Sequence, residues 1–313
     1  MSEKQLITQQ PVFGLNNLGN TCFMNAAIQL FLSIQDFIDY LQKDDWMNIV
    51  VKKCNGKTEQ EIIQLCENYL FITFYKFVFH NKEEKVKNPI NFIKHCLNKN
   101  RNNISIGPQG DSNEFLLMIF NTISEELEDK NEEGKQIKSI LDNLFQYSIE
   151  KNIECKSCNN IEKTKQNELF IPIYLKSEEN LSIQNEINNL KPVDIVNDYK
   201  CKCGNNNIEI KSNIENTGKY LLIQIMRFKK NGFIYTKDNT QINIDLELEI
   251  CNKKYNLISV ICHSGGLNGG HYYNYSKRND KWYCFNDSQV SEENENFINS
   301  VKSSAYILLY FVK

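Results

Sequence analysis

The sequence predicts an α+β protein, with helices in its first half and mostly antiparallel strands in its second half. Apolar residues recur at helical spacing at 22–41, 61–79, 89–97 and 112–127. From about residue 147 they instead form short β-type runs, at 147–153, 169–175, 220–228, 255–262, 271–276 and 305–312. Helices and strands that are segregated along the chain, rather than alternating, are typical of this class.

Composition limits the kinds of partner to consider. The 313 residues with 41% hydrophobic content suffice for a substantial core. The 36 basic and 39 acidic residues are well mixed, which argues against a nucleic-acid or membrane partner. The first ten residues lack an apolar signal core, and the run 69–80 is too short to span a bilayer. We therefore expect an intracellular protein of the cytoplasm or nucleus.

No internal repeat and no Pro- or Gly-rich linker divides the chain. We expect a short tail at residues 1–12 and a single domain at 13–313. The segment 177–197 is rich in Asn and Glu and is expected to connect structured parts. Eleven cysteines, an odd number without a secretory signal, favour thiol or metal chemistry over a disulfide framework.

One cysteine lies at the predicted entrance of the first helix. A Gly- and Asn-rich loop at 14–20 leads into an amphipathic helix that begins near Thr21 or Cys22. The unpaired N–H groups and the positive dipole end of a helix favour a thiolate, so we expect a lowered pKa at Cys22. The same N–H groups can stabilise an oxyanion. Taken alone, this feature fits a buried structural cysteine better.

A histidine that could serve as the base of a catalytic thiol opens a predicted hairpin. Of the four histidines, His80 and His95 fall in helical stretches and suit packing. His271 begins two aromatic runs around a polar turn at 278–280, which is typical of a β-hairpin. Reflection across that turn places His271 opposite Asn286 or Asp287. A one-residue slip exchanges the two, so both remain candidates for orienting the imidazole.

Two further patterns are a predicted helix cap at Asp111, in the helical half, and two cysteine pairs in the half predicted to form strands. Asp111 can cap the helix at 112–127, and Glu114 can complete a capping box. The pairs Cys155–Cys158 and Cys201–Cys203 together offer the four thiolates of a structural zinc site, although the second pair is one residue shorter than usual. Four reduced cysteines without metal are the alternative.

The stretch from Gly14 to Asn25 closely resembles the cysteine box of the ubiquitin-specific proteases, which are papain-like deubiquitinases. Residues 269–290 resemble the histidine box of that family, and Gln109, Asp111 and Glu114 match its Gln-Asp-Glu motif, with Gly110 in place of a second glutamine. The matched positions of the cysteine box are Gly14, Leu15, Asn17, Gly19, Asn20, Thr21, Cys22, Phe23, Met24 and Asn25.

The resemblance implies a role for each matched residue. Cys22 is the expected nucleophile and His271 its base, oriented by Asn286, while Asn17 supports the oxyanion and Asp287 is a second polar partner. Residues expected to hold the ubiquitin tail are Gln109, Asp111 and Glu114. Those expected to bind a zinc ion that ties the finger tips together are Cys155, Cys158, Cys201 and Cys203. His263 resembles a second family histidine with only a minor prospect of direct catalysis.

The resemblance also implies a right-hand architecture. The thumb would span about 13–146, the fingers about 147–230, and the palm about 165–175 and 219–313. A glycine-rich loop at 264–270 would border the channel for the ubiquitin tail.

The implied reaction is hydrolysis of the bond after the C-terminal glycine of ubiquitin, through a thioester and without a catalytic cofactor. Ubiquitin and ubiquitinated proteins are the expected partners, with regulatory or scaffold subunits as further candidates. Alternatives are a non-enzymatic ubiquitin-binding scaffold, a protease for another ubiquitin-like modifier and a zinc-binding interaction domain.

Overall fold

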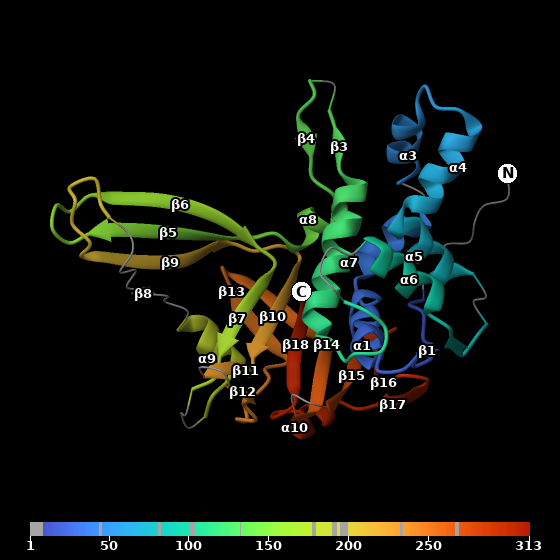
Figure 1. Cartoon of the computed structure of the whole chain (residues 1–313). Helices are drawn as coiled ribbons and strands as arrows, with labels where there is room; N and C mark the ends of the chain where they lie inside the picture. The colour runs from blue at the N-terminus through green and yellow to red at the C-terminus, as the bar shows by residue number, and fades with distance from the viewer. Residues whose placement is uncertain are drawn as a thin grey trace.

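Helices and strands segregate along the chain, as expected from the sequence (Figure 1). The structure is a computed structural model. It describes residues 9–43, 46–80, 83–99, 104–131, 133–176, 180–189, 193–194, 200–231, 234–266 and 269–313. The helices of the first half are α1 (Cys22–Phe31), α2 (Gln35–Gln42), α3 (Met47–Cys54), α4 (Glu59–Asn68), α5 (Leu70–Phe79), α6 (Ile90–Lys99), α7 (Ser112–Leu127) and α8 (Ile140–Phe145).

Two helices that the sequence pattern predicts as continuous are each broken in two. The predicted helix at 22–41 divides into α1 and α2, and the one at 61–79 divides into α4 and α5 at the extended Tyr69. The second break has a tertiary cause. The buried carboxylate of Glu126, on α7, accepts hydrogen bonds from the N–H groups of Leu70 and Phe71 at 2.9 and 3.1 Å. It therefore caps a new helix start.

An eight-stranded sheet forms the second half of the molecule. Its strands run in the order β17-β16-β15-β14-β18-β10-β7, and β13 also pairs with β14. All of these pairs are antiparallel except β10 with β7. The strands are β7 (Phe170–Tyr174), β10 (Tyr220–Met226), β13 (Glu247–Ile250), β14 (Lys253–Gly266), β15 (Gly269–Arg278), β16 (Lys281–Asn286), β17 (Gln289–Glu293) and β18 (Ala305–Val312).

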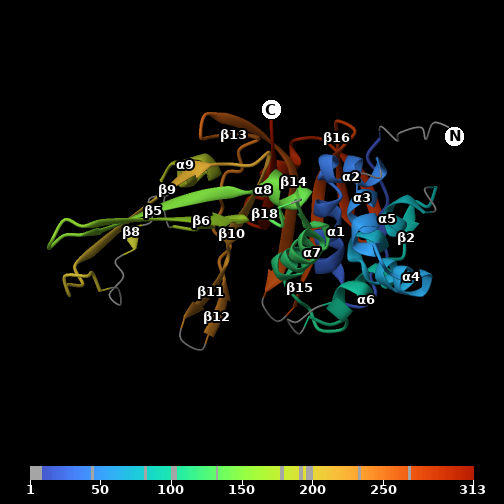
Figure 2. The same ribbon diagram turned by 90° about the horizontal axis from the view of Figure 1, so that it is seen from above.

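A separate ribbon projects from the sheet, away from helices α3 to α6 in both Figure 1 and Figure 2. It has the strand order β6-β5-β9-β8, and most side chains of β6 are exposed. Ion pairs cross its strands, such as Lys163–Glu150 and Lys165–Glu215. The strands are β5 (Tyr147–Cys155), β6 (Ile161–Glu168), β8 (Val193–Asp194) and β9 (Ile208–Asn216). The polar and charged sequence of β6, with an apolar residue only at Ile161, explains why apolar periodicity did not predict that strand.

Several short elements complete the described part of the chain. They are β1 (Gly14–Leu15), β2 (Val86–Lys87), β3 (Asp129–Lys130), β4 (Gln136–Ile137), α9 (Ile183–Asn188), β11 (Phe228–Asn231), β12 (Ile234–Lys237) and α10 (Phe297–Ser300). Helix α9 lies in the predicted connecting segment 177–197, of which 177–179, 190–192 and 195–197 lie outside the described residues. Of the predicted tail, 9–12 are described.

Helix α1 is the element that joins the two halves. All ten of its residues are buried, and it packs against both α7 and β15. Its apolar side chains belong to one core with those of α5, α7 and the facing side of the sheet. Cys22 is therefore fixed at the junction between the helical half and the sheet. None of the helices in the described ranges has the length and apolar content needed to cross a membrane.

Candidate active site

The loop before α1 is shaped by side chains that bond to its own backbone. Gly19 and Asn20 both have positive φ, 95° and 53°, a region that glycine and asparagine tolerate best. Asn17 Oδ1 accepts from the N–H groups of Gly19 and Thr21 at 3.0 and 3.2 Å, and Thr21 Oγ1 accepts from that of Leu18 at 2.8 Å. This bonded turn leads directly into Cys22, the first residue of α1.

The thiol of Cys22 is buried and lies against β15. Burial raises its pKa above the ordinary value, and the negative charge of Asp287 raises it further. Backbone N–H groups, chiefly that of Tyr272, act in the opposite direction but do not outweigh burial. The expectation of a lowered pKa from the helix entrance alone is therefore wrong for the free protein, because desolvation disfavours the thiolate.

The hairpin β15–β16 forms as the sequence predicts. Arg278 pairs with Lys281, so Asn279 and Asp280 make a two-residue turn. Both have positive φ, 50° and 65°, as a type I′ turn requires. Gln10 from the N-terminal segment binds the turn through three hydrogen bonds with Asn279. Pairing between the strands continues as far as Asn274 with Phe285, so Asn286 lies just beyond the last pair.

This register brings His271 to Asn286. His271 Nε2 and Asn286 Oδ1 are 2.6 Å apart. Because the amide oxygen only accepts, Nε2 is the donor in this hydrogen bond, and Nδ1 is the ring nitrogen that Asn286 leaves unbound. No hydrogen bond joins Cys22 to His271 among the described residues, although the residue next to His271, Tyr272, contacts the Cys22 sulfur through its N–H.

Asp287 faces a different pair of side chains. Its Oδ2 accepts from Asn17 Nδ2 at 2.9 Å, and its Oδ1 accepts from Asn25 Nδ2 at 2.8 Å. Its backbone oxygen accepts from the N–H of Leu15 at 2.8 Å. Of the two candidates that the sequence left open, Asn286 contacts the imidazole and Asp287 binds the loop before α1. Asn25, in the buried first turn of α1, is one of the matched cysteine-box positions, but the sequence analysis assigned it no role.

Gln109 binds the strand that carries His271. Its amide donates to Gly270 O at 2.7 Å and accepts from Gly270 N at 3.0 Å. The Gln109 side chain therefore pairs with the backbone of Gly270, next to His271, as a residue of a neighbouring strand would. The sequence motif gave no sign of this contact, because Gly270 lies 161 positions further along the chain.

Asp111 caps α7, as predicted, by accepting from Asn113 N at 2.6 Å. Glu114 is exposed, and the expected reciprocal capping-box bond is not found among the described residues. The second oxygen of Asp111 accepts from the hydroxyl of Tyr306 on β18 at 2.7 Å. Burial raises the pKa of Asp111. Residues Gln109, Asp111 and Glu114 share a hollow with Phe228, His263 and Tyr272.

His263 lies beneath this hollow. It is buried against the rings of Phe228 and Tyr272, with ring centroids 5.5 and 4.5 Å apart. Burial and the nearby charges of Lys237 and His271 lower its pKa to about 4, so the ring is neutral at pH 7. Lys237 Nζ also donates to the carbonyl oxygens of His263 and Gly265, at 2.7 and 3.1 Å. These contacts suit packing at the base of the glycine-rich loop.

The two cysteine pairs meet at the tip of the ribbon. The four sulfur atoms all lie within 4.8 Å of one another, with Cys158–Cys201 at 3.6 Å and Cys155–Cys203 at 3.7 Å. Each pair is followed directly by a residue with positive φ, Asn159 at 58° and Gly204 at 83°. The shorter Cys201–Cys203 pair therefore turns through Gly204 and still presents both thiols.

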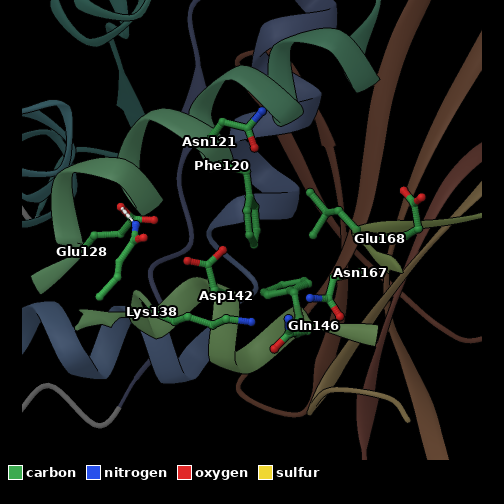
Figure 3. A pocket seen from close by; sticks show the side chains of 11 residues that line it. Phe120, Asn121, Glu128, Lys138, Asp142, Gln146, Asn167 and Glu168 are labelled. Carbon is green, nitrogen blue, oxygen red and sulfur yellow. Dashed lines mark hydrogen bonds between the residues drawn. The ribbon is translucent and has the colours of Figure 1, made fainter. Parts of the chain in front are cut away.

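Another hollow, of about 520 Å³, lies where α7, α8 and β6 meet (Figure 3). Phe120, Phe145 and Leu169 contribute its apolar side chains, and Gln136 donates a hydrogen bond to Glu128 in its lining. It has no cysteine or histidine in its lining. This hollow therefore lacks the residue types that a thiol nucleophile and an imidazole base require.

A helix-borne cysteine beside a strand that carries a histidine bonded to an asparagine is the arrangement of papain-like cysteine hydrolases. Sequence comparison places the chain more narrowly. It belongs to the ubiquitin carboxyl-terminal hydrolase family, whose sequence profile it matches over residues 13–310. The family assignment made from the cysteine and histidine boxes is thereby confirmed.

Two curated relatives share most of this chain. Probable ubiquitin carboxyl-terminal hydrolase 4 of Schizosaccharomyces pombe is 26% identical over 358 residues, which cover 96% of this chain and 58% of the relative. Ubiquitin carboxyl-terminal hydrolase 8 of Saccharomyces cerevisiae is 22% identical over 340 residues, covering 96% of this chain and 70% of the relative. The chain thus spans little more than half of the first relative.

Solved structures confirm the predicted α+β fold. The SAGA DUB module of Ubp8, Sgf11, Sus1 and Sgf73 bound to monoubiquitin matches with a TM-score of 0.79 and 22% identity, covering 97% of this chain and 70% of the matched chain. The same module bound to ubiquitin aldehyde matches with a TM-score of 0.78 at 22% identity, with the same coverage.

The raised pKa of Cys22 predicts slow alkylation of the free protein at neutral pH. The rate of Cys22 modification by iodoacetamide, followed by mass spectrometry of its peptide, should climb as pH rises beyond the ordinary thiol pKa of about 8.5. The Cys22→Ala variant removes the signal and serves as the control. A rate that levels off below pH 7 would contradict this account, since it would reveal a thiolate–imidazolium pair already formed.

Proposed function

We propose that this chain is a deubiquitinase that cleaves the peptide or isopeptide bond after the C-terminal glycine of ubiquitin. Cys22 is the nucleophile, His271 the base and Asn286 the residue that orients the imidazole. The observation that supports this most strongly is the 2.6 Å contact between His271 and Asn286, on a strand whose next residue contacts the Cys22 sulfur. Family membership supplies the class of substrate.

The tautomer fixed by Asn286 determines the direction of proton transfer. With its hydrogen on Nε2, the imidazole can accept the Cys22 proton only at Nδ1. In the free protein the thiol is buried against β15 and its pKa is raised. We therefore assign the proton transfer to the substrate-bound state, in which the sulfur has to lie within hydrogen-bonding reach of Nδ1. The thiolate then attacks the terminal glycine carbonyl, and His271 gives the proton to the departing amine. Water, activated by the same imidazole, hydrolyses the thioester.

Asn17 is the proposed side-chain donor to the oxyanion. Its oxygen is held by the loop backbone, and one of its amide hydrogens is held by Asp287, so the amide plane is fixed. The second Nδ2 hydrogen and the N–H of Cys22 are the donors that we assign to the tetrahedral intermediate. Asp287 accordingly supports the oxyanion donor and does not orient the base.

The hollow beside Asp111 is the proposed channel for the ubiquitin tail. Asp111 and Glu114 supply carboxylates at the start of the thumb helix α7, and Gly266 and Tyr272 also line the hollow. Gln109 acts on the same channel by holding Gly270. An extended tail that ends in glycines fits between walls that approach through backbone groups.

The cysteine cluster is proposed to hold a structural zinc ion. Zinc–sulfur bonds of about 2.3 Å in a tetrahedron place sulfur atoms about 3.8 Å apart, close to the 3.6 and 3.7 Å separations found here. Few apolar side chains otherwise hold the ribbon tip: Ile153, Ile208 and Ile210 pack with Cys155 and Cys201. A four-thiolate site has no position for water, so its role is structural.

We assign the right-hand parts from these positions: thumb at about 13–146, fingers at about 147–230, and palm at about 165–175 and 219–313, forming one catalytic domain at 13–313. The fingers hold the body of ubiquitin. Regulatory subunits are proposed as further partners, because the matched Ubp8 structures contain Sgf11, Sus1 and Sgf73. Eleven free cysteines suit a reducing compartment, the cytoplasm or nucleus.

Hydrolysis of ubiquitin that carries a C-terminal fluorogenic amide tests the proposal. Wild type should release the fluorophore, and Cys22→Ala should lose at least about 10³-fold in kcat/KM while still binding ubiquitin, since only the nucleophile is removed. Equal activity of the two proteins would refute the role of Cys22. Binding without hydrolysis by wild type would favour a non-enzymatic scaffold, and cleavage of another modifier alone would reassign the substrate.

Metal analysis of the purified protein tests the zinc proposal. Wild type should contain about one zinc ion per chain. Cys155→Ser and Cys201→Ser should each lose most of it, because each removes one of four ligands. Cys66→Ser, a change at a cysteine outside the cluster, is the matched control and should retain the metal. A metal-free wild type would contradict the proposal.

A further inference from the structure

The contact between α1 and β15 contains a buried polar seam where an apolar interface would be expected. Alternate residues of β15 point toward α1, and three of them, Asn274, Ser276 and Arg278, are polar and have no exposed surface. Ser33, just beyond α1, joins them with 2% of its surface exposed. We call these four residues, together with Ser259 on β14, the polar seam.

Hydrogen bonds connect the polar seam without interruption. Arg278 Nη1 donates to Ser33 Oγ at 2.6 Å, and Ser33 Oγ donates to Ser276 Oγ at 3.1 Å. Ser276 bonds in turn to Asn274 Oδ1 at 2.5 Å and to Ser259 Oγ at 2.7 Å. The chain of bonds therefore runs from the end of α1 across two adjacent strands of the sheet.

Arg278 is the unusual member of this set, because its buried guanidinium has no carboxylate partner in the described structure. Nη2 donates to Gln29 O at 2.6 Å and Nη1 to Lys277 O at 3.1 Å, while the ring of Phe285 lies 5.3 Å away. Burial lowers the pKa of Arg278 to about 9, so it remains charged at pH 7. Its counter-charge is the negative end of the α1 dipole, at the Gln29 carbonyl.

Burying these polar groups costs more free energy than apolar packing would, but their hydrogen bonds fix the placement of α1 on β15. An apolar helix face can slide or rotate on a sheet with little change in energy, whereas a fork of charged donors bonds to its acceptors in one register. Cys22 begins the helix that ends at this seam. His271 lies on the strand that carries Arg278. The seam therefore sets the position of the thiol-bearing helix along the histidine-bearing strand.

We propose that Arg278 is a positioning residue for catalysis, which locks α1 onto β15 so that Cys22 and His271 are aligned. This inference rests on the proposed function, because it assumes that these two residues react together. Arg278 itself touches neither the substrate channel nor the thiol. Its removal should impair the chemical step and leave ubiquitin binding intact.

Kinetics of Arg278→Met, Arg278→Lys and wild type with the fluorogenic ubiquitin substrate test the inference. Methionine keeps the length and apolar contacts but cannot bond to Gln29 O or Ser33. We expect kcat to fall about 10- to 100-fold, the cost of a small misplacement of reacting groups. Ubiquitin affinity, measured in a Cys22→Ala background, should change less than about twofold. Arg278→Lys keeps the positive charge and can still donate toward one of the two acceptors, so its kcat should lie between those of Arg278→Met and wild type.

The matched control is Glu126→Ala, which removes another buried charged group that caps a helix but lies outside the seam. It should lower thermal stability and leave kcat within about twofold of wild type. If Arg278→Met does not fold, Ser33→Ala removes the shared hydroxyl while retaining the charge, and it should lower kcat in the same way.

The outcomes separate this inference from the proposed function. An inactive wild type would contradict the proposed function itself. An active wild type with unchanged kcat in Arg278→Met and Ser33→Ala would overturn the positioning role alone. Equal losses of kcat in these variants and in Glu126→Ala would also overturn it, because they would indicate a general effect of lowered stability.

Discussion

The register of the β15–β16 hairpin is the constraint on which the rest of the site depends. Asn279 and Asp280 make a two-residue turn with positive φ, and this turn determines every pair that follows. A slip of one residue would exchange Asn286 with Asp287. In the observed register the amide meets the imidazole at 2.6 Å, and the carboxylate meets the loop before α1. The position of this turn thus determines which polar side chain meets the imidazole and which meets the loop before α1.

The same alternation along β15 divides its side chains between two tasks. Residues on one side, including His271, face the aromatic side of the hairpin, and Tyr273 stacks near the imidazole at 6.4 Å. Residues on the other side, from Tyr272 to Arg278, face α1 and are buried. The helix that begins with Cys22 therefore packs against the strand that carries His271. Burial at this junction also raises the pKa of Cys22.

The sequence predicted what depends on local pattern or on family motifs: the α+β class, α7 with its Asp111 cap, and β18 to the residue. The hairpin turn was also predictable from its polar residues. Long-range contacts were not, because no local pattern encodes them. Examples are the Glu126 cap that divides α4 from α5, the Gln109–Gly270 bonds and the raised pKa of Cys22. Charged strands such as β6 have no alternating apolar residues from which they could be predicted.

A double-mutant cycle on kcat/KM tests most directly whether Asn286 and Asp287 have the separate roles that follow from the hairpin register. The losses of kcat/KM caused by Asp287→Ala and Asn17→Ala should be strongly non-additive, because the Asp287 carboxylate acts by fixing the Asn17 amide. The loss of kcat/KM caused by Asn286→Ala, which acts on His271, should add in full to the loss caused by either of these two variants. Full additivity of Asp287→Ala with Asn17→Ala, together with non-additivity of Asn286→Ala and Asn17→Ala, would contradict the account.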